Sequence, residues 1–324
     1  MIDRYVSDKY NFNLPVYNIT HHNCTDGFAS HWSLVQAFGE DNVEYVAGRR
    51  TELPDLVQVP QGSTVIITDF SYTRELMIEL AQRSDQVIVL DHHASAEKDL
   101  DGLDEEIDNL TIVFDMDRSG AGITWDEFFA PVTDRPRMLD YIEDRDLWNN
   151  SMPNYLEVGA YVQNVPRNLK AYDKLISTPI TQVILEGKGA YATRKMMFED
   201  AARSAVLGRF EIEGYGTIEM PVTNCTYPIG SEAAEVMTQM YDYPLAAYFL
   251  HNGSGTISYG FRSRDDGVTD VSIIAGAIAA QHGPGVSGGG HVSASGVGPF
   301  ASPIHEVLDA PPAPRFEEAA QEQA

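Results

Sequence analysis

Five short apolar runs, rich in β-branched residues, recur along the first part of the chain and constrain its fold more than any other feature. They cover residues 15–20, 43–47, 63–69, 86–91 and 110–115. Helical patterns such as GFASHWSLVQAF and TRELMIELAQRS lie between them. Strands that alternate with helices at this spacing form βαβ units and a parallel sheet. The runs are almost continuously apolar, as expected of strands whose sheet is covered by helices on both faces.

A second α/β unit follows in the second half of the chain. Strands are expected at 209–215, 217–224, 244–252 and 256–264, and helices at 231–241 and 270–281. We therefore predict an α/β protein of two domains, with a larger parallel-sheet domain at 1–180 and a smaller α/β domain at 208–308. Residues 181–207 are expected to form a connecting helix, and residues 309–324 a disordered acidic tail.

The charge balance and the apolar pattern exclude several classes of partner. The chain has 22 basic and 48 acidic residues, a net charge of -26. Binding to duplex DNA depends on Lys and Arg that displace counterions, so we expect no duplex DNA partner. No apolar run approaches the roughly 20 residues of a membrane span, and the first residues do not resemble a signal peptide. We expect no membrane partner, a cytoplasmic location, and reduced thiols at Cys24 and Cys225.

Polar side chains follow three of the predicted strands, at the point where each strand ends. The first strand is followed by His21, His22, Cys24 and Asp26, the third ends at Asp69, and the fourth ends in Asp91, His92 and His93. The carboxyl ends of parallel strands meet at one edge of a sheet, so these side chains are expected to converge. Mixed His and Asp ligands suit an ion such as Mn²⁺, whereas tetrahedral zinc favours His and Cys.

Asp69 stands between the other two groups and is the natural bridging residue. Converging carboxylates repel one another unless cations lie between them. Two metal ions about 3.5–4 Å apart, bridged by a shared aspartate, would solve this problem and would activate a water for attack on a phosphoester. Each residue alone also has an ordinary explanation. Asp69 could cap a helix at Thr73, and Cys24 could be a small buried hydrophobe.

These residues resemble the motifs of the DHH phosphoesterases. The DHH tripeptide at 91–93, the H-x-x-x-D-G pattern at 22–27 and the isolated Asp69 match its catalytic domain, and SGGGHVSASG at 287–296 resembles the glycine-rich signature of the DHH-associated domain. FRSR at 261–264 and TDVSIIAG at 269–276 precede that signature in the order of the family. The group includes RecJ-type exonucleases, phosphodiesterases of nanoRNA and of the products of cyclic dinucleotides, and inorganic pyro- and exopolyphosphatases.

The resemblance implies two divalent ions, most simply Mn²⁺, with Mg²⁺ or Co²⁺ as alternatives. His22 and Asp69 would hold the first ion, and Asp26, Asp69 and His92 the second. His93 would face the scissile phosphate, so that His93 and Asp69 are the expected catalytic residues.

The resemblance leaves alternatives open for the fourth motif, for Asp91 and for Cys24. The fourth motif of the family is an aspartate, for which Asp144 fits best and Asp146 competes. Asp91 is a weaker ligand candidate that could instead orient a ligand. Cys24 stands where most members have an aspartate, and a thiol is a poor ligand for Mn²⁺. The first site would then be completed by water or His21, or would take a softer metal.

The second domain is expected to bind substrate. Its glycines can bring backbone N–H groups close to a phosphate, and its arginines can form bidentate phosphate contacts. The candidates are Arg262, Arg264, Gly288, Gly289, Gly290 and His291. Weaker candidates are Arg118 and Ser119, which could place a helix N-terminus at the cleft. The alternatives are a flexible glycine loop with solvated arginines, and an ordinary helix cap.

Together these features predict a metal-dependent phosphodiesterase that hydrolyses short oligonucleotides or small dinucleotides by two-metal activation of water. The acidic composition favours a small nucleotide or a short single strand as substrate over a long polyanion. Homodimer formation is left open. Two alternatives remain, an exopolyphosphatase or pyrophosphatase, and a non-catalytic protein that binds and sequesters nucleotides.

Overall fold

A computed structural model describes residues 10, 13–21, 24–49, 52–264 and 269–308. The predicted ligand His22 and the predicted tail at 309–324 lie outside these described residues. Contacts divide the chain into two compact units, Met1–Tyr191 and Ala192–Ala324. The division falls within α9 (Ile180–Arg203), in the segment for which a connecting helix is expected.

The first unit is built on a five-stranded sheet in which every neighbouring pair is parallel. The strand order is β2-β1-β3-β4-β5, so β1 and β3 lie beside each other near the middle. The strands are β1 (Val16–His21), β2 (Val43–Gly48), β3 (Thr64–Thr68), β4 (Gln86–Asp91) and β5 (Leu110–Phe114). The predicted parallel sheet is confirmed.

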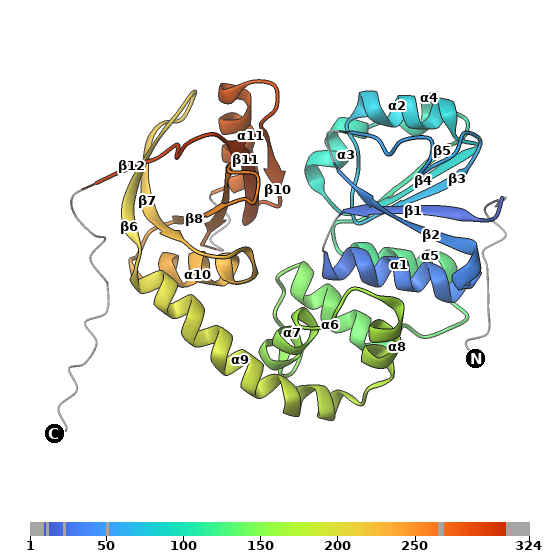
Figure 1. Cartoon of the computed structure of the whole chain (residues 1–324), viewed down its shortest axis with the longest axis horizontal. Coiled ribbons are helices and arrows are strands. Elements are labelled where there is room, and N and C mark those ends of the chain that lie inside the picture. Colours follow the sequence, from blue (N-terminus) through green and yellow to red (C-terminus); the bar gives the residue numbers. More distant parts are fainter. Residues whose placement is uncertain (1–9, 11–12, 22–23, 50–51, 265–268, 309–324) are drawn as a thin grey trace. The chain divides into compact units, whose positions relative to one another are not determined.

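Helices cover both faces of this sheet because successive side chains of the central strands point to opposite sides. Ile66, Ile88 and Leu90 pack in a core with α1 (Thr25–Phe38) and α5 (Gly120–Phe129). Their neighbours in the chain pack in a second core with α2 (Arg74–Arg83) and α3 (Ala94–Leu100). Figure 1 shows α1 and α5 below the sheet, and α2 with the short α4 (Leu103–Glu106) above it.

Three more helices complete the first unit between the sheet and α9. They are α6 (Arg137–Asp146), α7 (Tyr155–Gln163) and α8 (Leu169–Ser177), and a short 3-10 turn at Glu40–Asn42 follows α1. Apolar residues from all three helices join the core on the α1 side of the sheet. Every helix in the described part of the chain is too short or too polar to span a bilayer.

The second unit is a seven-stranded mixed sheet in the order β10-β11-β9-β8-β7-β6-β12. One core joins the sheet to α11 (Val271–His282), and another joins its other face to α10 (Tyr227–Met240) and the end of α9. The strands are β6 (Val206–Ile212), β7 (Gly216–Asn224), β8 (Leu245–His251), β9 (Ile257–Ser263), β10 (Ser287–Gly290), β11 (Ala294–Phe300) and β12 (Glu306–Val307). With both sheets in place, the α/β prediction is confirmed.

The glycines at 288–290 are expected in a loop, but the structure places them in β10, at the edge of the second sheet. β10 pairs with β11 and lies against α11. A Cβ at Gly288 would come within 2.2 Å of the carbonyl oxygen of Ala275 in α11. The absence of a side chain therefore allows this close helix–strand approach.

His31 lies in the middle of α1 and is buried, with its Nδ1 3.1 Å from Oδ1 of Asn18. Burial lowers the pKa of its ring from 6.5 to about 4. Between these two pKa values the His31 ring is therefore protonated in the unfolded chain and neutral in the folded chain. The contribution of the neutral His31 ring to the free energy of unfolding is complete above the pKa that the ring has in the unfolded chain. It is lost as the pH falls from about 6.5 towards 4.

His31→Gln is expected to flatten this pH dependence. Between pH 7.5 and pH 5 the unmodified chain should lose about 2 kcal/mol more free energy of unfolding than the variant. Glutamine keeps a donor for Asn18 but does not titrate. Urea unfolding at the two pH values measures the difference, with His251→Gln at an exposed strand end as the control. Identical pH profiles for His31→Gln and the unmodified chain would contradict the prediction.

Candidate metal centre

Acidic and imidazole side chains converge in the first unit at the carboxyl edge of its sheet. One ligand atom from each of Asp26, Asp69, His92 and Asp146 lies within 4.8 Å of the other three. Asp69 directly follows β3, His92 directly follows β4, and Asp26 lies in the first turn of α1, just after β1. Asp146 is the last residue of α6. Three of these four are the ligands expected for the second ion.

A second group of ligand atoms overlaps the first. It consists of His21, Cys24 and Asp69, again within 4.8 Å of one another. Oδ2 of Asp69 lies 3.2 Å from Nε2 of His21, and Oδ1 of Asp69 lies 3.1 Å from Nε2 of His92. The two oxygens of one carboxylate therefore face two different groups, which is the arrangement that a bridging ligand requires.

The backbone at Asp69 is left-handed, with φ of 56°. Its N–H donates to the carbonyl oxygen of Leu90 on β4, at 3.0 Å. Aspartate enters this conformation more readily than most residues, because its short polar side chain can form local hydrogen bonds. The N-terminus of α5 packs directly on this turn, since a Cβ at Gly120 would lie 2.5 Å from Cβ of Asp69. A glycine is required there.

The protonation of the cluster shows how crowded its negative charges are. Burial, and then the nearby Asp69 carboxylate, raise the pKa of Asp26 well above its usual value, and raise that of Asp146 as well. Burial opposes ionisation of Asp69 also, but contacts with His21 and His92 hold its pKa well below the usual range. Burial lowers the pKa of His92, but its carboxylate neighbours outweigh burial and raise it to about 10. Protons thus fill the role that cations would fill.

The residues present fit divalent cations. Oδ2 of Asp69 and Oδ2 of Asp146 are buried, and among the described residues neither accepts a hydrogen bond. Their nearest cationic contacts are histidine nitrogens, at 3.2 Å for Asp69 and 3.3 Å for Asp146. Carboxylate oxygens and imidazole nitrogens are suitable ligands for Mn²⁺.

The sequence pattern favours Asp144 as the fourth-motif aspartate, but the structure places Asp146 in the cluster instead. The Asp144 carboxylate accepts hydrogen bonds from the backbone N–H of Ser151 and of Met152, and from Oγ of Ser151 at 2.7 Å. It therefore fastens the turn after α6. Side chains two positions apart on a helix point in nearly opposite directions. Only one of Asp144 and Asp146 can therefore point at the cluster.

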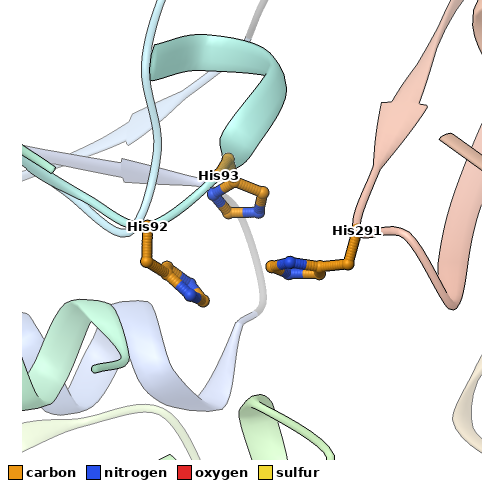
Figure 2. A group of neighbouring side chains, drawn as sticks. All are labelled: His92, His93 and His291. Carbon is orange, nitrogen blue, oxygen red and sulfur yellow. The ribbon is translucent and has the colours of Figure 1, made fainter. Parts of the chain in front are cut away.

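Asp91 orients the histidine pair and does not lie among the clustered ligand atoms. Its Oδ1 is 2.7 Å from Nδ1 of His93 and accepts from the N–H of His92 at 2.8 Å. Its Oδ2 accepts from the Ser71 hydroxyl at 2.5 Å. Figure 2 shows the His92 and His93 rings next to each other where β4 leads into α3, and their centroids are 4.7 Å apart. Ser71 is a functional candidate that no motif revealed, and its only signal was its place two residues after Asp69.

Cys24 is the N-terminal cap residue of α1 and belongs to the group with His21 and Asp69. Burial, and then the Asp69 carboxylate, raise the pKa of the Cys24 thiol to about 12. In the absence of a metal the thiol is therefore protonated at neutral pH. A metal ion bound by Cys24 would have to displace this proton, whereas His21 and Asp69 can offer their ligand atoms more readily.

Asp26 is held in place by the start of α5. Its Oδ1 accepts from the Ser119 hydroxyl at 2.6 Å, and its Oδ2 accepts from the N–H of Ala121 at 3.0 Å. Ser119 is the cap of this helix, and its Oγ also accepts from the N–H of Gly122. The predicted substrate residue Ser119 thus positions a candidate metal ligand.

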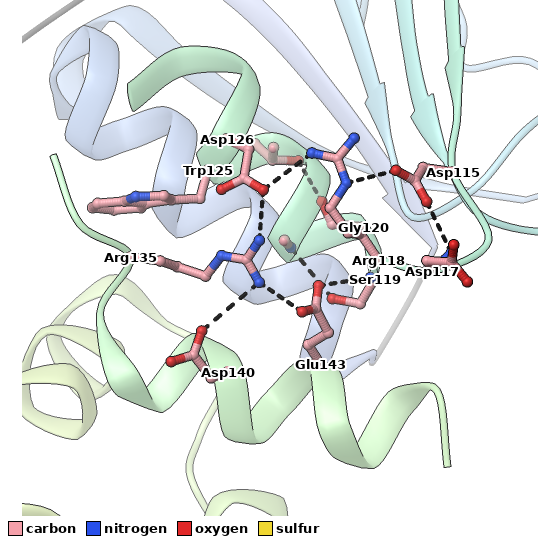
Figure 3. A network of polar contacts seen from close by, with 12 residues as sticks. Asp115, Asp117, Arg118, Ser119, Gly120, Trp125, Asp126, Arg135, Asp140 and Glu143 are labelled. Atoms are coloured by element: carbon pink, nitrogen blue, oxygen red, sulfur yellow. Dashed lines mark hydrogen bonds and ion pairs between the residues drawn. The ribbon is translucent and has the colours of Figure 1, made fainter. Parts of the chain in front are cut away.

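The predicted substrate residue Arg118 is engaged in an ion-pair network, which Figure 3 shows. Its Nε lies 2.8 Å from Asp115 and its terminal nitrogen 3.0 Å from Asp126. Arg135 bridges Asp126 and Glu143, at 2.6 Å from each. These arginines are neutralised within the first unit and do not present free charge to a phosphate.

Glu143 connects this network to the metal centre. Its Oε2 accepts from the N–H of Ser119 at 3.0 Å, and it lies on α6, the helix that ends with Asp146. The network therefore ties together the two helices that carry Asp146 and support Asp26. No sequence pattern points to Glu143, because its partners come from distant parts of the chain.

Ser119→Ala is expected to weaken the affinity for Mn²⁺ by about 10-fold or more, since removal of a hydrogen bond to a ligand commonly has this effect. Isothermal titration with Mn²⁺ measures the change. Ser33→Ala is the matched control, because Ser33 is also buried, but its hydroxyl donates to the carbonyl oxygen of Ala29 and not to a candidate metal ligand. Equal Mn²⁺ affinities for the two variants would show that Ser119 does not position Asp26.

The second unit contains the remaining predicted substrate residues. Arg264 forms an ion pair with Asp242 at 2.9 Å and donates to the carbonyl oxygen of Tyr243, so it is used in fastening the end of α10. Arg262 lies in β9 and is buried. His291 lies in the turn between β10 and β11, where its N–H donates to the carbonyl oxygen of Ala294, and Figure 2 includes its ring.

The sequence of this chain is similar to that of a viral protein. No family model matches the chain. It is 26% identical over 298 residues to the uncharacterized protein R106 of Acanthamoeba polyphaga mimivirus, a match that covers 86% of this chain and 66% of that protein. The chain thus spans slightly less than two thirds of the length of this relative.

Solved structures with a similar arrangement include a phosphodiesterase and a RecJ protein. The pGpG-specific phosphodiesterase PggH from Vibrio cholerae is 12% identical with a TM-score of 0.45, and the match covers 87% of this chain and 92% of that one. RecJ from Thermus thermophilus, in complex with Mn²⁺, is 14% identical with a TM-score of 0.48, over 88% and 49% of the two chains. Both TM-scores lie below 0.5.

Proposed function

We propose that this chain is a DHH-type phosphoesterase that depends on divalent metal ions and hydrolyses phosphodiester bonds in short oligonucleotides or dinucleotides. One observation carries the proposal. Two groups of ligand atoms, one on each side of Asp69, share that residue at the carboxyl edge of a parallel sheet. A single structural ion would not need the second group.

In this proposal Asp26, Asp69, His92 and Asp146 hold one ion, and Asp69 with His21 and His22 holds the other. The ions supply Lewis acidity, which lowers the pKa of a bound water and offsets the negative charge of the phosphate. Mn²⁺ is the preferred ion, and Mg²⁺ and Co²⁺ are the alternatives.

The protein's own residues orient the metal ligands and contact the substrate. Asp91 fixes the His93 ring through Nδ1 and leaves Nε2 to contact an oxygen of the phosphate. Burial of the cluster excludes bulk water and strengthens each of these electrostatic contacts. Ser119 and the start of α5 keep Asp26 directed into the cluster.

The second unit is proposed to bind substrate through Arg262, His291 and the backbone of Gly288, Gly289 and Gly290. Arg264 drops out of this set because its guanidinium is committed to Asp242 and to backbone carbonyls. The net charge of -26 favours short substrates, because a long polyanion would be repelled by most of the chain.

A panel of substrates tests the proposal. pApA, single-stranded RNA and DNA of graded length, duplex DNA, pyrophosphate and polyphosphate are each incubated with Mn²⁺, Mg²⁺ or Co²⁺, and kcat/KM is measured. We expect the highest kcat/KM for pApA with Mn²⁺, with a decrease as the chain grows. A preference for long strands would overturn the choice of substrate. Hydrolysis of pyrophosphate alone would favour the pyrophosphatase alternative, and tight binding without cleavage the sequestering alternative.

A further inference from the structure

A cavity of about 550 Å³ opens in the first unit between α1, β2 and the start of α8. This is within the range of roughly 300–1,000 Å³ found for sites that bind small molecules. Its walls include Phe28 and His31 of α1, Tyr45 of β2, and Arg167 and Lys170 near the start of α8. None of these residues takes part in the metal centre.

Aromatic rings form one wall of the cavity. The Tyr45 ring is 39% exposed, although it rests on buried neighbours. Its centroid is 5.7 Å from that of Phe28 and 4.9 Å from that of His31, with both pairs tilted or edge-on. Phe28 packs in turn on Tyr172, at 4.8 Å. These contacts fix the Tyr45 ring from behind and leave part of it accessible, as a platform for a planar ligand requires.

The opposite side of the cavity is positively charged, against the trend of the whole chain. Arg167 and Lys170 face one acidic residue, Glu40, in a chain whose net charge is -26. Arg167 donates to Oγ1 of Thr25 at 2.9 Å and to the carbonyl oxygens of Gln163 and Val165 at 3.3 Å. Its guanidinium is therefore held in place without a carboxylate partner among these contacts, and keeps its charge for a ligand.

The cavity adjoins the metal centre through the first turn of α1. Thr25, which binds Arg167, lies between Cys24 and Asp26 in the chain. The N–H of Phe28 donates to the carbonyl oxygen of Cys24 at 3.2 Å. Tyr45 is also close enough to His21 and Cys24 to interact with them electrostatically. The cavity therefore lies next to the metal centre along the first turn of α1.

We propose that this cavity is a nucleoside subsite, in which one base of the substrate stacks on Tyr45 while Arg167 and Lys170 contact the adjoining sugar-phosphate. This inference rests on the proposed function and adds to it a site in the first unit that recognises a base. An aromatic platform accepts any base, because every base has a π-face. Such a subsite would favour nucleotides over polyphosphate without selecting a sequence.

Kinetics on pApA with Mn²⁺ test the subsite with Tyr45→Ala, and with Tyr45→Phe as the matched control that keeps the ring. Two analogues of pApA, each lacking one of its two bases, are used alongside. Tyr45→Ala is expected to raise KM for pApA about tenfold or more, in line with the loss of one stacked base, with little change in kcat. The effect should disappear on the analogue that lacks the stacked base, and Tyr45→Phe should stay near the unmodified KM.

Lys170→Gln provides a second variant that cannot act through misfolding, because Lys170 is exposed on α8. It should raise KM for pApA several-fold, whereas Lys174→Gln, an exposed lysine one turn further on the same helix, should not. An unchanged KM in Tyr45→Ala, or an equal rise on both base-lacking analogues, would overturn the subsite even if hydrolysis itself is confirmed.

A binding assay separates failure of the subsite from failure of the proposed function. pApA is titrated into the protein in EDTA, and its Kd is measured by calorimetry. If the protein hydrolyses none of the substrates but binds pApA more weakly after Tyr45→Ala, the subsite stands and the phosphodiesterase proposal falls. If Tyr45→Ala and the unmodified chain bind pApA equally, or neither binds it, the subsite falls.

Discussion

Asp69→Asn is expected to lower kcat/KM for dinucleotide hydrolysis by about a thousandfold. Asp69 belongs to both groups of ligand atoms, so its loss weakens both ion sites at once. Each tenfold change in rate corresponds to about 1.36 kcal/mol, and metal ions typically contribute several kcal/mol to stabilisation of the transition state. Asparagine adopts the left-handed backbone as readily as aspartate does, so the fold should be retained.

Steady-state kinetics with Mn²⁺ and calorimetric titration of Mn²⁺ measure the two consequences of Asp69→Asn. The number of ions bound with high affinity should fall from two to one or none. Asp242→Asn is a backbone-matched control, because φ is 57° at Asp242 and 56° at Asp69. If Asp69→Asn retains more than a tenth of the activity, Asp69 is not the bridging ligand.

Asp146→Asn is expected to lower kcat/KM by about a hundredfold or more, whereas Asp144→Asn should leave it nearly unchanged. The carboxylate of Asp146 lies 3.3 Å from Nε2 of His92 within the cluster. The carboxylate of Asp144 instead accepts hydrogen bonds from the turn at Ser151 and Met152. Asp144→Asn should therefore lower the free energy of unfolding by about 1–2 kcal/mol, because hydrogen bonds to a charged carboxylate are stronger than those to a neutral amide.

The two aspartates are a matched pair because the same substitution is made two residues apart on one helix. Mn²⁺ affinity and kcat/KM report the role of each residue at the metal centre, and urea unfolding of the metal-free protein reports its role in stability. The reverse result, an inactive Asp144→Asn and an active Asp146→Asn, would mean that α6 presents its other face to the ions.

Much of the first unit could be predicted from the sequence. Its five strands lie within about one residue of the predicted ranges, because each is a mostly apolar run between polar segments. The convergence of Asp26, Asp69 and His92 could also be predicted, since the carboxyl ends of parallel strands share one edge. The local sequence pattern was enough to predict where a residue lies whenever its position follows from the end of its strand.

The remaining features depend on contacts between distant segments. The sequence pattern favoured Asp144, but the choice between Asp144 and Asp146 depends on which face of α6 meets the sheet. Arg118 looked free to bind phosphate because Asp126 and Arg135 become its neighbours only through folding. β10 was missed because glycine has a low strand propensity, and its strand exists through pairing with β11.

At position 69 the left-handed backbone favours a glycine, whereas the proposed metal centre requires a carboxylate. A glycine there would adopt the same φ without the steric cost of a Cβ, and would remove a buried carboxylate from beside Asp26 and Asp146. Asp69→Gly would therefore relieve the strained backbone, but it would also remove the negative charge that His21 and His92 contact, and with it the bridging ligand. Screens of this chain for thermal tolerance alone would not reveal the loss of function at this turn, and should be paired with an assay of turnover.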